Sequence, residues 1–491
     1  MAGIAGVLSP NKHQLVLRIL GKISHRGTTS PEIWNNPHSV LGATGLSGLN
    51  EDPGPKTSIG RDQAIVMDGI IDNRQILRKL LEINQGELIS DPEIILRAYE
   101  EHGAKIFELI KGKFALAIVS GADFMIVRDR LGIQPLYYGY HDGTLCFASE
   151  IKGLVGIADK IREFPPGHFL HSDKGLFPYK PYKPKPVPMN APKDSSEIFI
   201  EHLSRSVGKA VTKSAKVGVW LSGGVDSSVI AALARPFVDR LYTFSAGIEG
   251  APDIKYARKV AKYIDSDHHE RIYNLSDMLT VLEKTIYHLE SFDAPLVNSA
   301  VSNYLVSELA ADHVPFVLSG EGGDELLAGY AYQKEICNST QLTLSIQKAI
   351  ADLHNTALQR VDRSATAHSI AVEMPFLSEN VIRFSLAIPA PWKIYGSKKM
   401  DKWPLRKGLA DILPDEIAWR DKSKFWEGSG TADLLIKFAN SKISNREFSN
   451  ERTLENGANL RSKEELLYYR IYKKYFGDSI PLKEVGRTQH I

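Results

Sequence analysis

The sequence is poor in cysteine, in long apolar runs and in net charge. Its two cysteines, Cys146 and Cys337, lie far apart, which excludes a disulfide framework and leaves neither with a metal-like partner nearby in the sequence. The formal net charge of +2 is too near balance to predict a nucleic-acid partner. Because no apolar stretch is long enough for a membrane helix and no signal pattern opens the chain, we expect a cytoplasmic protein without a membrane partner.

The length of 491 residues, of which 43% are hydrophobic, is enough for two or three domains with their own cores. Proline alternates with lysine and tyrosine over residues 177–188, which favours an extended linker. We therefore predict a first domain over residues 1–175, a linker over 176–194 and a second domain over 195–491. The sequence leaves a homodimer open.

The two halves differ in their predicted secondary structure. In the first half, apolar strand patterns dominate and few helices separate them, which predicts an α+β layered domain. From residue 197 onwards strand and helix patterns alternate, which predicts an α/β domain with a parallel sheet, helices on both faces and a site at the carboxyl ends of the strands. His268 and His269 invite a metal-site interpretation, which we reject because neighbouring strand residues face opposite sides.

The strongest chemical signal is a glycine turn between an apolar strand pattern at residues 217–221 and a helical pattern. Glycines let the backbone approach an anion, and the first N–H groups of a helix have no partner of their own. The loop lacks the lysine-bearing pattern of a Walker A loop, but Asp226 could hold Mg²⁺ beside the phosphates. The alternative is a turn that binds nothing. The phosphate-binding candidates are Ser222, Gly223, Gly224, Asp226, Ser227 and Ser228.

A second loop, with three acids among three glycines, follows the apolar run of residues 314–318. Asp226 and Asp324 lie on separate loops, as a Mg²⁺ ion that bridges the phosphates of a nucleotide would require. Taken alone, the loop could be an acidic surface turn. Beside the first loop, we interpret it as the second wall of a nucleotide site.

The stretch Ser-Gly-Gly-Val-Asp-Ser-Ser resembles the pyrophosphate loop of the ATP pyrophosphatases, which cleave ATP between its α and β phosphates. The acidic loop and residues 402–407 and 419–430 match the synthetase domain of asparagine synthetases, so the resemblance covers nearly the whole chain. It implies an adenine nucleotide α-hydrolase-like fold with ATP and Mg²⁺ as cofactors, and it implies that Lys422 contacts pyrophosphate. The residues implied to contact the rest of the nucleotide are Leu221, Ala246, Ser319, Gly320 and Glu321.

The first half is similar throughout to the glutamine amidotransferase (Ntn hydrolase-like) domain of that family, in which a cysteine at position 2 attacks glutamine. Here that residue is Ala2. The family's carboxylate-binding arginine falls at Gly45, and its oxyanion-hole Asn-Gly falls at Asp68-Gly69, where a carboxylate would repel the oxyanion. Asp91 alone matches, as the residue that binds the glutamine amine. An engineered exchange would alter Ala2 alone, so three departures favour natural loss, and we predict no glutaminase activity.

Near the expected acceptor site, Ala371 replaces a family Glu, Glu373 replaces an Arg and Ser378 replaces an Asp. β-Lactam synthetases share the architecture, lack the glutaminase cysteine and use other acceptors. Glu373 would suit an amine as charge partner or base, with Tyr330 assisting, so we predict that the acceptor is not free aspartate. The alternative is that Glu373 only pairs with an arginine such as Arg363.

These features predict an enzyme that adenylates a small-molecule carboxylate with MgATP and releases pyrophosphate, after which an amine or ammonia forms an amide. The alternatives are an ammonia-dependent asparagine synthetase (glutamine-dependent if Ala2 is engineered), a β-lactam-synthetase-like ligase, a non-catalytic family member and a tRNA-modifying ATP pyrophosphatase. Intact Asp226, Asp324 and Lys422 count against a non-catalytic member. The near-neutral charge and the lack of cysteine pairs count against a tRNA enzyme.

Overall fold

The computed structural model describes residues 2–46, 54–57, 62–84, 86–178, 189, 191–396, 398–420, 429–455, 457–477 and 482–488. The chain forms two compact units. The first comprises Met1–Pro181 with Lys473–Val485, and the second comprises Tyr182–Tyr472 with Gly486–Ile491. The predicted linker of residues 176–194 overlaps the strand Gly175–Pro178 at its start and the helix Pro192–Val211 at its end. Most of the residues between these two elements lie outside the described part of the chain, and the domain bounds stay predictions.

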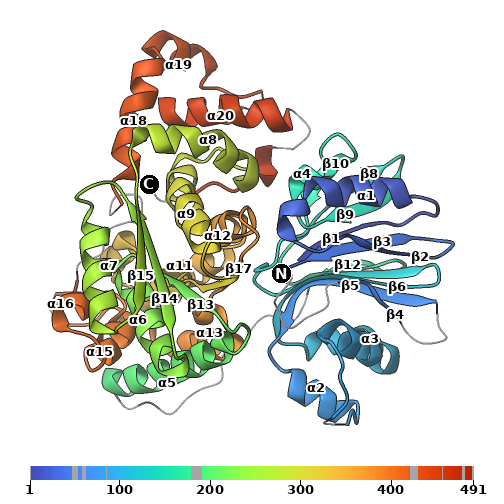
Figure 1. The fold of residues 1–491 in the computed structure, drawn as a ribbon, viewed down its shortest axis with the longest axis horizontal. Helices are drawn as coiled ribbons and strands as arrows, with labels where there is room; N and C mark the ends of the chain where they lie inside the picture. The colour runs from blue at the N-terminus through green and yellow to red at the C-terminus, as the bar shows by residue number, and fades with distance from the viewer. Residues whose placement is uncertain are drawn as a thin grey trace. The chain divides into compact units, whose positions relative to one another are not determined.

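The first unit consists of two stacked six-stranded sheets, drawn in blue to cyan in Figure 1. One sheet has the order β10-β8-β9-β1-β3-β2 and the other the order β12-β11-β7-β6-β5-β4. Their strands are β1 (Ala2–Val7), β2 (Glu32–Asn35), β3 (Val40–Gly45), β4 (Lys56–Thr57), β5 (Gln63–Ile71), β6 (Gly112–Ser120), β7 (Asp123–Arg128), β8 (Tyr137–His141), β9 (Thr144–Ala148), β10 (Asp159–Glu163), β11 (His168–His171) and β12 (Gly175–Pro178). The helices are α1 (His13–Lys22), α2 (Arg74–Leu80), α3 (Asp91–His102) and α4 (Ile151–Leu154). The predicted α+β layered domain is confirmed.

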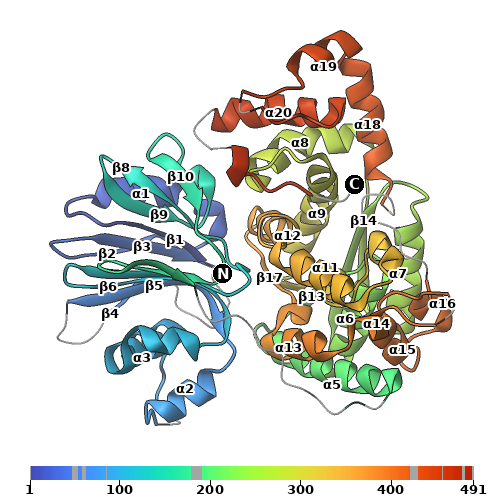
Figure 2. The ribbon, with the colours of Figure 1, turned by 180° about the vertical axis from the view of Figure 1, so that it is seen from behind.

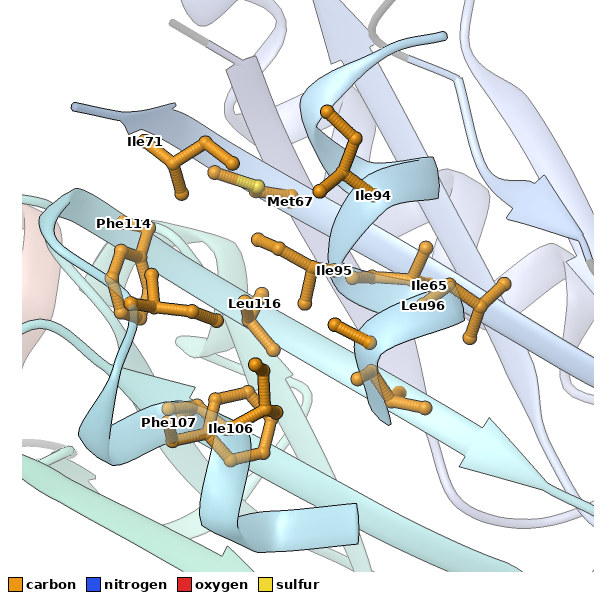
Figure 3. Close-up of a cluster of buried hydrophobic side chains, with 14 of the residues drawn as sticks. Ile65, Met67, Ile71, Ile94, Ile95, Leu96, Ile106, Phe107, Phe114 and Leu116 are labelled. Carbon is orange, nitrogen blue, oxygen red and sulfur yellow. The ribbon is translucent and has the colours of Figure 1, made fainter. Parts of the chain in front are cut away.

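Side-chain alternation along β5 and β6 explains the layers. On β6, Leu116 lies in a buried cluster with α3, whereas Ala115 and Ala117 lie in the cluster between the two sheets. Successive strand residues point to opposite faces, so one strand supplies both cores. Figure 3 shows the α3 side of this arrangement, where Ile94 and Ile95 lie against the sheet.

The second unit contains a five-stranded parallel sheet with the order β15-β14-β13-β16-β17. Its strands are β13 (Val217–Trp220), β14 (Leu241–Gly247), β15 (Asp267–Ile272), β16 (Phe316–Leu318) and β17 (Ala371–Glu373). The chain runs outwards from β13 to β15 and then adds β16 and β17 on the other side of β13. The point where the direction reverses lies between β13 and β16, and open α/β sheets bind ligands at such a point.

Helices cover both faces of this sheet, as predicted. In both ribbon views α7 and α9 lie on opposite sides of β14 (Figures 1 and 2). The helices are α5 (Pro192–Val211), α6 (Val225–Ala234), α7 (Pro252–Tyr263), α8 (Leu275–Leu289), α9 (Ala294–Ala311), α10 (Gly323–Leu326), α11 (Ser339–Ala351), α12 (Ala357–Thr366), α13 (Glu379–Ala387), α14 (Ala390–Lys393), α15 (Trp403–Leu409), α16 (Asp415–Ala418), α18 (Thr431–Lys442), α19 (Asn445–Glu451) and α20 (Lys463–Phe476). None of the helices in the described part of the chain combines the length and apolar character that a membrane crossing requires.

Leu116→Ala tests the packing of the first unit. Its side chain is fully buried in the cluster with α3, so truncation should cost about 2–5 kcal/mol through lost burial and a residual cavity. Calorimetry of the whole chain should show the transition of the first unit lowered by roughly 5–15 °C. Leu88→Ala, at a fully exposed leucine of the same unit, is the control, and an equal shift in both variants would contradict the packing described here.

Candidate functional site

The candidate site lies where the loops after β13 and β16 meet. The amide of Leu221 donates to the carbonyl of Phe244 on β14 at 2.7 Å, and the amide of Ser319 donates to the carbonyl of Glu373 on β17 at 2.8 Å. Each loop is therefore tied to the neighbouring strand at its first residue. Both loops open at the carboxyl edge of the sheet, where the sequence predicted the site.

The first loop can form only because position 223 is glycine. Gly223 has a φ of +70°, and a Cβ there would lie 2.5 Å from the backbone nitrogen of Ala257. The hydroxyls of Ser222 and Ser227 lie 3.0 Å apart and brace the turn from inside. Gly224 then precedes α6 without a capping side chain, so the first N–H groups of α6 are available to an anion.

The second loop approaches the first at backbone distance. A Cβ on Gly320 would lie 2.7 Å from the nitrogen of Ser227, and a Cβ on Gly323 would lie 2.4 Å from Oδ1 of Asp226. Glycine at these two positions lets α10 start beside the Asp226 carboxylate. The structure thus brings together the two loops that the sequence predicted to form one site.

A lysine connects the two predicted metal ligands. The Nζ atom of Lys402 lies 2.7 Å from Oδ1 of Asp324 and also contacts Oδ2 of Asp226. Burial alone would lower the pKa of Lys402, but the two carboxylates outweigh it and raise that pKa above its ordinary value, so the amine is charged. Sequence analysis included Lys402 in the matching stretch 402–407 but assigned it no role, because nothing in the spacing of residues 226, 324 and 402 indicates that they meet.

The Asp226–Asp324 pair fits Mg²⁺ by the chemistry of its donors. Mg²⁺ is usually held by one or two carboxylates together with substrate phosphates and water. Among the described residues, no group of three or more His, Cys, Asp or Glu side chains is arranged to hold a metal. The pair would therefore hold the ion together with phosphate oxygens, and the assignment as metal ligands stays a proposal.

Two further acids line the same loop. Glu321 binds Nη2 of Arg360 at 2.6 Å. Glu325 is buried and accepts a hydrogen bond from the Tyr330 hydroxyl through Oε1, whereas its Oε2 has no hydrogen-bond partner among the described residues. Burial, followed by the neighbouring Glu321 and Asp324, raises the pKa of Glu325 to about 7. Sequence analysis assigned no role to Glu325, although it stands next to Asp324.

Tyr330 remains a phenol. Burial and the neighbouring acids Glu325 and Asp324 raise its pKa well above the ordinary value, so Tyr330 acts here as a hydrogen-bond donor. Its predicted catalytic role stays a prediction.

Glu373 is held by a cation that the sequence did not indicate. Its carboxylate lies 2.6 Å from Nζ of Lys213. Arg363, the partner considered from the sequence, binds Glu290 at 2.9 Å and Asp362 at 2.6 Å, and its pairing with Glu373 stays a prediction. Because Lys213 balances the charge of Glu373, the argument against aspartate as acceptor, which assumed an added anion, loses its basis. The catalytic role of Glu373 stays a prediction.

The structure describes some of the remaining residues that the sequence predicted to contact the nucleotide. Leu221 and Ala246 are buried at the ends of β13 and β14, and Ser319 is buried at the start of the acidic loop. Their contact with adenine and ribose stays a prediction. Lys422, predicted to contact pyrophosphate, lies outside the described residues.

In the first unit, two of the predicted glutamine-site residues, Ala2 and Asp68, contact a buried arginine, and a third, Gly45, pairs with Ala2. Ala2 pairs with Gly45 between β1 and β3, and its amide donates to Oδ1 of Asp68 at 2.8 Å. Arg26 donates to the Ala2 carbonyl at 3.0 Å and to Oδ2 of Asp68 at 2.9 Å, and its third contact is Glu150 at 2.8 Å. Sequence analysis assigned no role to Arg26.

The other two predicted residues lie on β5 and at the start of α3. Gly69 has a φ of +117°, and a Cβ there would collide with the Lys113 carbonyl at 2.1 Å. Asp91 binds Arg74 at 2.7 Å and the Ile71 amide at 2.9 Å. The match of Asp91 to an amine-binding residue stays a prediction.

Comparisons with known proteins cover both units. The family model "Asparagine synthase" matches residues 199–349 and 338–480, and the model "Glutamine amidotransferase domain" matches residues 1–163. Asparagine synthetase [glutamine-hydrolyzing] 2 of Arabidopsis thaliana is 31% identical over 515 residues, covering 98% of this chain and 88% of the relative. Asparagine synthetase B [glutamine-hydrolyzing] of Escherichia coli is 30% identical, covering 92% of this chain and 86% of the relative.

Among solved structures, a Bacillus subtilis glutamine phosphoribosylpyrophosphate amidotransferase covers 55% of this chain and 90% of its own. Its TM-score is 0.34 and its sequence identity 15%. This similarity is too low to add to the family assignment.

These comparisons correct one prediction. An amide synthetase without glutaminase activity is contradicted by the amidotransferase match over residues 1–163 and by relatives named as glutamine-hydrolysing. The structure weakens one of the three grounds for that prediction, the charge of Asp68. We expected the Asp68 carboxylate to repel an oxyanion, but Asp68 is ion-paired with Arg26, so its charge is balanced. The resemblance to asparagine synthetases and the predicted fold of both domains are confirmed.

Gly320→Ala tests the close approach of the two loops. The added methyl group would collide with the backbone of Ser227 and Asp226, and the loops would have to separate. We expect carboxylate-dependent ATP–pyrophosphate exchange to fall on the order of 100-fold. Gly21→Ala, where an added Cβ meets open space, is the control, and undiminished exchange in Gly320→Ala would contradict the described contact.

Glu325→Gln tests the buried carboxyl through pH. Because the folded pKa of about 7 lies above the ordinary value of 4.5, the wild type loses stability as pH rises from the lower value to the higher one. The glutamine variant has no such loss, so it should gain up to about 3 kcal/mol relative to wild type across this range. Thermal unfolding from about pH 5 to about pH 8 measures the difference, with exposed Glu249→Gln as control. A pH-independent difference would refute the assignment.

Proposed function

The chain belongs to the asparagine synthetase family of ATP-dependent, AMP-forming carbon–nitrogen ligases, and we propose that it converts aspartate to asparagine with MgATP and glutamine. The observation that carries the proposal is the Asp226–Lys402–Asp324 cluster beside the glycine loop at the β13–β16 edge. The names of the curated relatives supply asparagine as product and glutamine as nitrogen source.

In this proposal the second unit activates the carboxylate. The N–H groups at the start of α6 receive phosphate oxygens. Asp226 and Asp324 would hold Mg²⁺, which would supply positive charge beside the phosphates. An aspartate side-chain oxygen attacks the α-phosphorus, and pyrophosphate leaves with the bridging electron pair. Lys402 supplies positive charge for that leaving group, and the same role for Lys422 stays a prediction.

The second step forms the amide. The nitrogen attacks the carbonyl carbon of the aspartyl-adenylate, AMP leaves with the electron pair of the acyl–oxygen bond, and a base takes the surplus proton. Glu325 is our candidate for that base, because a carboxyl with a pKa of about 7 accepts protons near neutral pH. The Tyr330 hydroxyl, hydrogen-bonded to Oε1, fixes its orientation.

The nitrogen source requires its own measurement, because residue 2 is alanine. We would supply the purified chain with aspartate and MgATP plus either amide-¹⁵N glutamine or ¹⁵N ammonium, and follow labelled asparagine and glutamate. Labelled asparagine with glutamate from the glutamine reaction supports the proposal. Asparagine from ammonium alone would contradict glutamine as donor and leave the synthetase chemistry intact. The cytoplasmic location and the homodimer stay predictions.

Asp226→Asn tests the synthetase site directly. Loss of one carboxylate charge beside the phosphates should lower aspartate-dependent ATP–pyrophosphate exchange by about 100-fold or more. Asp239→Asn makes the same change at an exposed position of the second unit and should retain exchange. Release of ADP and orthophosphate by the wild type, in place of AMP and pyrophosphate, would reject the proposed reaction.

A further inference from the structure

We infer that Lys402 is a built-in counter-cation that keeps Mg²⁺ off the Asp226–Asp324 pair until the phosphates of ATP arrive. The ammonium contacts Oδ2 of Asp226 and Oδ1 of Asp324, so it occupies the position between the two loops where an ion bridging these oxygens would lie. The inference rests on the magnesium part of the proposed function. It does not depend on the identity of the acceptor.

The position of Lys402 is fixed by the fold. Its side chain is only 4% exposed, and its backbone has a φ of 52° immediately before α15. Arg406 holds this corner by donating to the Asp401 carbonyl at 3.0 Å and to the Ala418 carbonyl at 3.0 Å. The ammonium therefore reaches the carboxylates from a rigid base.

The surroundings leave little room for a second cation. Beside the end of the lysine side chain, a Cβ on Gly329 would lie 2.0 Å from Oδ1 of Asp324 and 2.3 Å from Cε of Lys402. Oδ1 of Asp226 lies against Gly323, where a Cβ would be 2.4 Å away. A metal ion that bridges Oδ2 of Asp226 and Oδ1 of Asp324 would therefore displace the ammonium.

Electrostatics decides whether Lys402 or Mg²⁺ occupies the Asp226–Asp324 pair. With Lys402 in place, a dication would enter beside a fixed positive charge, and Mg²⁺ gives up its water reluctantly. Glu321 offers little compensation, because Arg360 already binds it. A bound triphosphate changes this charge balance. Its oxygens accept hydrogen bonds from the Lys402 ammonium, and they also add ligands for the metal. The metal and the nucleotide should therefore bind as a unit.

The test measures Mn²⁺ binding to the whole protein through the electron paramagnetic resonance signal of free Mn²⁺. The nucleotide is α,β-methylene-ATP, which resists cleavage between the α and β phosphates, and a titration without protein corrects for Mn²⁺ bound to free nucleotide. We expect the wild type to bind Mn²⁺ at least about tenfold more tightly with the analogue than without it. Lys402→Met should bind Mn²⁺ without nucleotide at least about tenfold more tightly than the wild type does.

Three variants serve as controls. Lys334→Met removes the cation that lies 3.0 Å from Asp401, with the same change in net charge beside the site, and should behave as the wild type. Lys402→Arg keeps a cation at the pair and should also bind Mn²⁺ weakly without nucleotide. Adding Asp226→Asn to Lys402→Met should abolish the gain, which would locate the metal at this pair.

Two results would overturn the inference. The first is a wild type that binds Mn²⁺ as tightly without nucleotide as with it, and this result needs no variant to fold. The second is a Lys402→Met protein that is folded by circular dichroism yet shows no gain in Mn²⁺ affinity. Failure of Mn²⁺ to bind even with the analogue would overturn the magnesium assignment itself, so the two failures are distinguishable.

Discussion

The second unit depends on the approach of two acidic loops at the carboxyl ends of β13 and β16. Gly320 and Gly323 permit the approach, because any side chain there would collide with the first loop. The approach places two carboxylates side by side, which would repel each other without a cation between them. Lys402 supplies that cation from a segment far along the chain. The geometry of the candidate nucleotide site therefore depends both on the backbone contact between the loops and on the charge that Lys402 supplies.

The first unit solves a similar problem with a different cation. Arg26 is fully buried and binds Asp68, Glu150 and the Ala2 carbonyl at once. A guanidinium presents several donors in a fixed plane, so it suits a permanent network, whereas an ammonium is a compact charge that can exchange partners. This difference agrees with a structural role for Arg26 and an exchangeable role for Lys402.

Local patterns predicted much of the molecule. The first half shows mainly strand patterns, and the second half shows strands that alternate with helices. This difference predicted the two fold classes, because strands and helices have different periods of apolar residues in the sequence. The glycine and acid loops were also recognised, since close phosphate approach limits the residues allowed there. The errors concern side-chain partners. Glu373 binds Lys213, which no pattern in the sequence indicated, and Asp68 was expected to repel an oxyanion although it is paired with Arg26.

The sequence by itself determined the family, the order of the elements and the two loops that carry Asp226 and Asp324, because each depends on residues near one another in the chain. Only the tertiary structure decided which cation meets which acid. Lys402 is 176 residues from Asp226, and Arg26 is 42 residues from Asp68. An ion pair depends on distance and desolvation in three dimensions, and sequence spacing carries neither quantity. The charge of each site, and with it the chemistry the site can support, was therefore set by folding.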